Sequence, residues 1–223
     1  MSRKPRIVLP GYLYHVTQRG NNRGYIFADD NDFILYLKRI EEYRQKCKVE
    51  IYAYCLMGNH VHFILKPLER DSLSRLFSIV HMRYAQYYKG KYNASGHVWQ
   101  GRFFSCMLDG EHLKQAIRYV EYNPVRARMV KMGWDYPWSS ARAHLGKNYK
   151  WITLADINAV IDVESWREYL MQGEDEGFVR ALREFTSKSY ILGAKDFILK
   201  IQEQIGKVII RNVRGRPSKN TEK

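Results

Sequence analysis

The 223-residue sequence lacks the features that mark secreted and membrane proteins. Its three cysteines, Cys47, Cys55 and Cys106, include no C-x-x-C pair, and an odd number argues against a disulfide framework, so we expect reduced thiols. No apolar run approaches the roughly 20 residues of a membrane span, and no apolar segment follows the basic N-terminus as in a secretory signal. We therefore expect a cytoplasmic protein that does not enter the membrane.

Acidic residues are also scarce, because 23 Asp and Glu stand against 37 Lys and Arg, which gives a net charge of +14. Nearly all of the excess lies in residues 1–150, which hold 25 basic and 12 acidic residues. Residues 151–206 carry a net −4 and residues 207–223 a net +5. A positive field of this size attracts polyanions by counterion release. It predicts nucleic acid, rather than a small-molecule substrate, as the partner, and an association with the nucleoid.

Hydrophobic periodicity predicts four strands and three helices in the first 146 residues. Alternating branched and aromatic residues indicate strands at 11–17, 49–57, 60–66 and 102–108. Apolar positions three to four residues apart indicate helices that begin near Asp30, Asp71 and Glu111, and Asn31 or Asp30 is the expected N-cap of the first. The order strand, helix, two strands, helix, strand, helix is that of a ferredoxin-like α+β sandwich with a mainly antiparallel sheet.

The remainder of the chain has a different pattern. Residues 164–185 and 194–205 have helical periodicity, which predicts a small C-terminal helical appendage. We divide the chain into a main domain at 1–149, a helical accessory region at 150–206 and a basic tail at 207–223. The tail includes Arg-Gly-Arg-Pro at 214–217, which resembles an AT-hook core, although a disordered basic tail is the simpler interpretation.

Two histidines separated by one residue, His60 and His62, begin the third predicted strand. Because side chains alternate across a strand, both imidazoles face the same way, and that geometry suits one metal ion. Histidines that only make structural hydrogen bonds are the competing explanation. With a third oxygen ligand and waters, the pair would suit Mg²⁺ or Mn²⁺ bridging to a phosphate. The other five histidines show no paired spacing, and we expect them to be structural or to face DNA.

Metal-assisted cleavage of a phosphate ester also requires a nucleophile. The helix from Glu111 places Tyr119 at the flank of its apolar stripe and turns Tyr122 nearly opposite, so Tyr119 is the better candidate. Asn123 lies four residues beyond Tyr119, where a continuous helix would make its amide oxygen a third metal ligand. Asn123 equally suits an N-cap before Pro124 at the first position of a new helix. The sequence leaves both roles open.

Five segments carry a resemblance to a known family: YHVTQRG at 14–20, MGNHVH at 57–62, QGRF at 100–103, YVEYNPVRA at 119–127 and DYPWSS at 135–140. Through them, residues 7–146 resemble the REP-associated tyrosine transposases, a branch of the single-tyrosine HUH transposases that cut and rejoin single-stranded DNA. The resemblance implies that His60 and His62 are metal ligands and that Tyr119 attacks a DNA phosphate, giving a 5′-phosphotyrosine link and a free 3′-OH.

The same resemblance implies a single-stranded DNA substrate that forms hairpins. In related transposases a glutamine four residues beyond the nucleophile is the third metal ligand, and this chain has the shorter Asn123 there. The candidate DNA contacts are Arg3, Lys4, Arg6, Arg19, Arg23, Arg102 and Arg126. We expect a monomer or a homodimer. A non-catalytic module that binds single-stranded nucleic acid by stacking, and a hydrolytic metallonuclease, are the alternative functions.

Overall fold

The computed structural model of the protein describes residues 8–147, 151–159 and 165–206. One sheet with the strand order β2-β3-β1-β4-β5 forms its centre. The first four strands pair antiparallel and β5 adds to β4 in parallel, with bounds β1 Leu13–Arg19, β2 Val49–Met57, β3 His60–Pro67, β4 Phe104–Leu108 and β5 Ile191–Leu192. The predicted ferredoxin-like sandwich with a mainly antiparallel sheet is confirmed, although β1 and β4 each begin two residues later than predicted.

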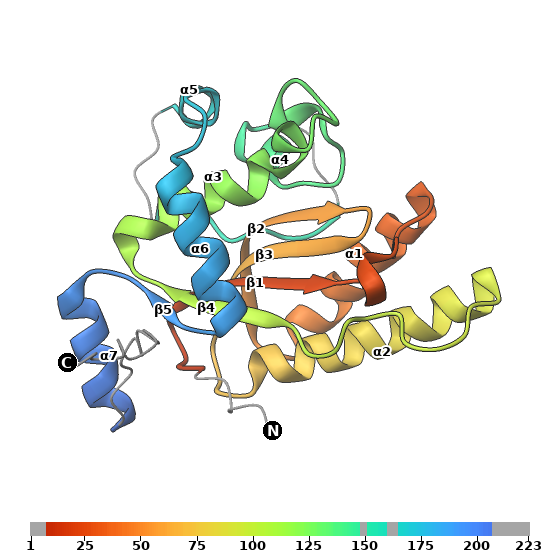
Figure 1. Ribbon diagram of the computed structural model, residues 1–223, viewed down its shortest axis with the longest axis horizontal. Coiled ribbons are helices and arrows are strands. Elements are labelled where there is room, and N and C mark those ends of the chain that lie inside the picture. Colours follow the sequence, from red (N-terminus) through yellow and green to blue (C-terminus); the bar gives the residue numbers. More distant parts are fainter. Residues whose placement is uncertain (1–7, 148–150, 160–164, 207–223) are drawn as a thin grey trace, which may run out of the picture.

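Helices cover both faces of this sheet (Figure 1). Helices α1 and α2 pack together on one face, while α3 and α6 lie against the strands on the other. The helices are α1 Asp30–Arg44, α2 Ser72–Tyr92, α3 Gly110–Arg126, α4 Ala141–His144, α5 Trp166–Met171, α6 Glu176–Lys188 and α7 Lys195–Ile205. Short 3₁₀ turns occupy Asn21–Arg23, Gly133–Asp135 and Ile157–Ala159. Within the part of the chain that the structure describes, none of the helices is long and apolar enough to cross a membrane.

Strand β3 shows how the sequence builds the two layers. Phe63 contacts the rings of Tyr36 from α1 and Phe77 from α2. Its neighbour His62 points the other way, toward the ring of Tyr119 on α3. Since successive side chains of a strand alternate between faces, Val61, Phe63 and Leu65 face the core of α1 and α2, while His60, His62 and Ile64 face the other layer.

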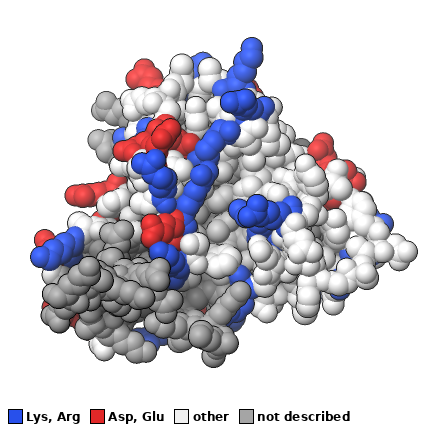
Figure 2. Space-filling view, viewed as in Figure 1, with Lys and Arg blue, Asp and Glu red and all other residues white. Residues whose placement is uncertain are grey.

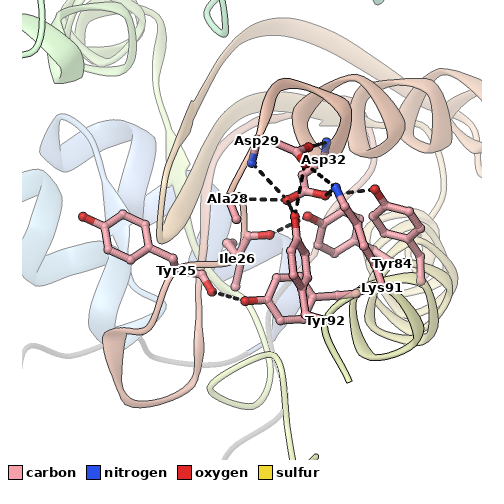
Figure 3. Close-up of polar contacts among 10 residues, drawn as sticks. Tyr25, Ile26, Ala28, Asp29, Asp32, Tyr84, Lys91 and Tyr92 are labelled. Carbon is pink, nitrogen blue, oxygen red and sulfur yellow. Dashed lines mark hydrogen bonds and ion pairs between the residues drawn. The ribbon is translucent and has the colours of Figure 1, made fainter. Parts of the chain in front are cut away.

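A buried carboxylate joins the start of α1 to the end of α2 (Figure 3). Asp32 is fully buried, and it accepts hydrogen bonds from the backbone of Ala28 and from the side chains of Lys91 and Tyr92. It also forms a capping box with Asp29, so the N-cap of α1 is Asp29 and the prediction of Asn31 or Asp30 was wrong. A buried charge requires this many partners, because an unpaired carboxylate inside a protein is strongly destabilising.

Helix α3 is anchored by a second buried carboxylate. Glu121 has no exposed surface and accepts hydrogen bonds from the Ser140 hydroxyl and the Trp166 indole N–H, the latter at 2.7 Å. Its Oε1 lies 2.6 Å from His144 Nδ1, and the Glu121 carboxylate holds the pKa of His144 above its ordinary value although burial alone would lower it. These contacts bring the loop around residues 133–146 and helix α5 against α3.

Helix α3 continues through Pro124 to Arg126, so Asn123 does not cap a new helix and that alternative was wrong. Pro124 has no N–H to donate to the carbonyl of Val120 four residues earlier. The Nδ2 of Asn123 donates to that carbonyl at 3.2 Å and to the carbonyl of Tyr119 at 3.0 Å. The side chain thus replaces the missing backbone hydrogen bond, which allows proline inside the helix.

The C-terminal residues are helical, as predicted, but the helix predicted at 164–185 is two helices. The break between α5 and α6 contains Gly173 with φ +75, a left-handed conformation that favours glycine, and Asp175 then caps α6 by accepting from the N–H of Phe178. Helix α6 packs directly on β4 and β1, and β5 extends the sheet. Helix α6 and strand β5 therefore belong to the sandwich itself.

Burial of His81 in the α1–α2 core predicts acid sensitivity. Burial lowers its pKa to about 3 from the ordinary 6.5, and its Nε2 lies 3.0 Å from the Tyr36 hydroxyl. Between these two pH values the unfolded chain binds a proton that the folded chain does not, so stability is present above pH 6.5 and is lost as pH falls toward 3. We expect His81→Gln to reduce this loss by on the order of 1 kcal/mol per pH unit. Urea unfolding over this pH range measures the free energy of unfolding of both proteins. An equal dependence of that free energy on pH in the wild type and in His81→Gln would contradict the prediction.

The role of Asn123 in accommodating Pro124 predicts a coupled pair of substitutions. Asn123→Ala leaves the Val120 carbonyl without its donor and should cost about 1–3 kcal/mol of unfolding free energy. In a Pro124→Ala background the new backbone N–H can supply that donor, so the cost of Asn123→Ala should fall by about 1 kcal/mol. A double-mutant cycle by urea unfolding measures this coupling. Equal costs in both backgrounds would show that the amide does not compensate for the proline.

Candidate active site

A cavity of about 530 Å³ lies on the face of the sheet that carries α3 and α6. Strands β1 and β3 form its floor, and the two helices supply its walls. Among the described residues that line it there is no acidic side chain, and those that bear chemistry are His15, Thr17, Gln18, Arg19, His60, His62, Gln100, Tyr119, Asn123, Arg126, Arg183, Thr186 and Ser187. Figure 2 shows basic side chains crossing the middle of this face, with acidic side chains beside them.

The two histidines of β3 face the cavity together. In the antiparallel pairing of β1 with β3, Thr17 lies opposite His62 and Arg19 lies opposite His60. The imidazole centroids of His60 and His62 are 4.9 Å apart, and both rings line the cavity. The predicted placement of both imidazoles on one face of the strand is confirmed.

Tyr119 meets these histidines from α3. Its ring lies edge-on to the imidazoles of His62 and His15, with a centroid distance of 5.6 Å in each case. Only 3% of Tyr119 is exposed, so the cavity is the route by which a substrate atom reaches its hydroxyl. Tyr122 is half-buried and does not line the cavity. The structure thus places Tyr119, and not Tyr122, beside the paired histidines.

Two arginines surround the phenol. Arg183 Nε donates to the Tyr119 hydroxyl at 3.4 Å, and the Arg126 guanidinium lies 4.4 Å from the Tyr119 ring centroid. Arg126 Nη1 also donates to both carboxylate oxygens of Glu174, at 2.7 and 2.8 Å. Burial raises the pKa of the Glu174 carboxyl, against the influence of Arg126. Arg126 is therefore held in place by Glu174, whereas Arg183 points a cation at the phenol oxygen.

Burial and positive charge keep the cavity imidazoles neutral. Burial lowers the pKa of His60 to about 4, with further lowering by Arg19, Arg126 and Arg183. Burial and the neighbouring His60 and His15 hold the pKa of His62 well below its ordinary value, and burial lowers that of His15 to about 3. A neutral imidazole has a nitrogen lone pair that can bind a metal ion.

The donor set fits a divalent metal only if an amide or a substrate oxygen takes part. Among the described residues, no group of three or more His, Cys, Asp or Glu side chains is placed to hold a metal ion. His60 and His62 supply two neutral nitrogens, and Asn123 lines the same cavity with both hydrogen bonds of its amide made through Nδ2. Its Oδ1 is the protein oxygen that would complete a site of two nitrogens and one oxygen, with the remaining positions for water or phosphate.

The predicted DNA contacts fall into three groups. Arg19 and Arg126 line the cavity. Arg23 and Arg102 are exposed and do not line it. Arg3, Lys4 and Arg6 lie outside the described residues. Whether any of the seven contacts DNA stays a prediction. Of the two that line the cavity, Arg126 is paired with Glu174, and among the described residues no carboxylate forms an ion pair with Arg19.

Sequence reasoning missed three residues of this site: His15, Arg183 and Thr186. His15 Nε2 lies 2.9 Å from His62 Nδ1, and His15 Nδ1 lies 2.8 Å from Thr186 Oγ1. The alternation of β1 puts His15 on the same face as Thr17 and Arg19, but only the pairing with β3 reveals that this face is the one with His62. Arg183 and Thr186 come from α6, more than sixty residues beyond Tyr119, and no spacing in the sequence connects them to it.

Comparison with known proteins identifies the family and similar folds. Residues 9–123 match the family model described as IS200-like transposase. A Haemophilus influenzae protein that bears the provisional name REP-associated tyrosine transposase is 25% identical over 170 residues, which cover 70% of this chain and 86% of that protein. The fold is similar to that of a REP-associated tyrosine transposase solved with a REP hairpin, with a TM-score of 0.53 and 20% identity over 74% of this chain and 96% of that one. The family model spans more than half of the sequence, and the chain belongs to the IS200-like transposases.

Proposed function

We propose that this transposase cuts and rejoins single-stranded, hairpin-forming DNA through a covalent link between Tyr119 and a 5′-phosphate. The observation that carries the proposal is the packing of the Tyr119 ring against His62 and His15, within a cavity that also contains His60. All of these residues belong to one chain, and this supports a site formed within a single subunit. If Tyr119 only filled space beside these histidines, the fold would not require a cavity next to its ring. The cavity therefore supports a binding site for a substrate.

Charge around the cavity supports a phosphodiester as the reacting group. Arg19, Arg126 and Arg183 line it, and no described lining residue is acidic. Arg183 already donates to the Tyr119 hydroxyl, so a phosphate that approaches this oxygen also approaches a guanidinium. Guanidinium groups bind phosphate oxygens through charge-assisted hydrogen bonds and stabilise charge that develops during phosphoryl transfer.

In the proposed reaction, one bond to phosphorus breaks for each bond that forms. The phenol gives up its proton, Tyr119 Oη forms a bond to phosphorus, and the bond from phosphorus to the 3′ oxygen breaks. The departing oxygen takes a proton and becomes a free 3′-OH, while the 5′ end stays on the protein as a phosphotyrosine. Attack of a 3′-OH on this link reverses the steps and rejoins DNA without an external energy source.

A divalent ion, Mg²⁺ or Mn²⁺, is part of the proposal. His60, His62 and Asn123 would hold it, and when bound it would neutralise charge on the scissile phosphate. The hairpin substrate is proposed from a relative, because the solved transposase with the shared fold was bound to a REP hairpin.

The proposal predicts a covalent adduct that depends on one tyrosine. Full-length protein incubated with single-stranded hairpin DNA and Mn²⁺ should give a denaturation-resistant protein–DNA species on a gel, and a chelator should prevent it. Tyr119→Phe should reduce adduct formation by on the order of a thousandfold or more, because the nucleophile is gone. Tyr122→Phe is the matched control, since it removes a hydroxyl from the same helix outside the cavity, and it should leave the adduct unchanged.

Each of the other outcomes would indicate a different nucleophile or a different function. An adduct that survives Tyr119→Phe would show that another residue is the nucleophile. Cleavage without any adduct would indicate a hydrolytic metallonuclease. Binding of the hairpin DNA with neither cleavage nor adduct, in the presence of Mn²⁺ and with Tyr119 intact, would indicate a nucleic-acid-binding module.

A further inference from the structure

Two chains of hydrogen bonds end on the Nδ1 atoms of the two β3 histidines. The first comes from the turn that precedes β3. Asn59 Nδ2 donates to the carbonyl of Arg23 at 3.0 Å, which orients the amide, and Asn59 Oδ1 lies 2.6 Å from His60 Nδ1. An amide oxygen can only accept, so His60 must carry its hydrogen on Nδ1. A neutral His60 then has a bare Nε2.

The second chain comes from the C-terminal region. Thr186 Oγ1 on α6 lies 2.8 Å from His15 Nδ1, and His15 Nε2 lies 2.9 Å from His62 Nδ1. Each neutral imidazole carries one N–H, so the chain has two possible directions. If His62 donates to His15, then His15 donates to Thr186 and His62 Nε2 is bare. If the direction is reversed, the hydrogen of His62 lies on Nε2 and that nitrogen cannot bind a metal.

The surroundings of the Thr186 hydroxyl favour one of the two directions. Burial raises the pKa of the Cys106 thiol on β4, and the nearby Thr186 hydroxyl opposes this rise, which is the effect of a hydroxyl directed at the sulfur. Cys106 uses its own S–H to donate to the carbonyl of Met107 at 3.5 Å, which leaves its sulfur as an acceptor for the Thr186 hydroxyl. With its hydrogen directed at Cys106, Thr186 Oγ1 accepts from His15 Nδ1. The chain therefore runs from His62 through His15 and Thr186 to Cys106.

We propose that Asn59, His15 and Thr186 are positioning residues that hold His60 and His62 with hydrogen on Nδ1, so that both present an unprotonated Nε2 to the cavity. Partners of this kind fix the tautomer and the ring orientation of metal-binding histidines. That these histidines bind a metal ion rests on the proposed function. Their tautomers are a property of the metal-free protein. Helix α6 thus sets the protonation pattern of a ligand on β3.

The tautomers can be measured without metal or DNA. Long-range ¹H–¹⁵N correlation spectra of full-length protein labelled with ¹⁵N-histidine distinguish Nδ1–H from Nε2–H rings. We expect His60 and His62 both to be Nδ1–H in the metal-free protein. A His62 ring with its hydrogen on Nε2 would overturn the proposal, whatever activity the protein has.

Thr186 substitutions test whether α6 controls His62. Thr186→Val keeps the shape but removes the acceptor, so we expect mixed tautomers at His15 and His62 and about tenfold weaker Mn²⁺ binding, measured by electron paramagnetic resonance. Thr186→Ser should restore both. Ser187→Ala is the matched control, because Ser187 lines the same cavity but donates to the Glu184 carbonyl, outside the chain of hydrogen bonds. A pure Nδ1–H ring at His62 in a folded Thr186→Val protein would overturn the role of Thr186.

The outcomes separate this proposal from the proposed function. Nδ1–H rings in a protein that forms no adduct would uphold the hydrogen-bond chains and refute the nicking and joining activity. The protein could instead form an adduct that depends on Tyr119 while His62 carries its hydrogen on Nε2. That result would support the proposed activity and contradict the proposed direction of the hydrogen bonds. If Thr186→Val failed to fold, the spectrum of the wild-type protein alone would still decide the direction.

Discussion

The antiparallel pairing of β1 with β3 is the constraint on which the candidate site depends. This register puts Thr17 opposite His62 and Arg19 opposite His60, so His15, Thr17 and Arg19 share a face with the two histidines. Side chains alternate along a strand, so a slip of one residue in β1 or in β3 would turn the polar side chains of that strand toward the core formed with helices α1 and α2. The same register that buries the aromatic core between the sheet and helices α1 and α2 therefore assembles the polar cavity behind it.

The second layer completes the cavity from two distant parts of the chain. Helix α3 supplies Tyr119 and Asn123, and its path through Pro124 depends on the Asn123 amide. Helix α6 supplies Arg183 and Thr186. Residues 151–206 carry a net negative charge, and Glu174 from this segment pairs with Arg126 of the basic main domain. Helix α6, which lies in the region predicted to be an appendage, is thus a wall of the site.

The parts that could be predicted were those governed by local physics. Alternation and helical spacing located β2 and α3 closely, and the stripe of α3 was enough to prefer Tyr119 to Tyr122. His15 was missed because its importance comes from strand register, a tertiary property that its local sequence does not carry. The sequence could not choose between the two roles of Asn123, because the cap is excluded by a side-chain amide that replaces the hydrogen bond removed by proline, which propensity rules for an isolated helix do not include.

We propose that His60, His62 and Asn123 form one metal site within reach of the Tyr119 hydroxyl. Anomalous scattering from a crystal of the full-length protein soaked in Mn²⁺ tests it most directly. We expect one dominant peak in the cavity, bounded by the Nε2 atoms of His60 and His62 and by the side-chain oxygen of Asn123. A peak bound elsewhere, or a well-ordered cavity without a peak when Mn²⁺ is in excess, would contradict it.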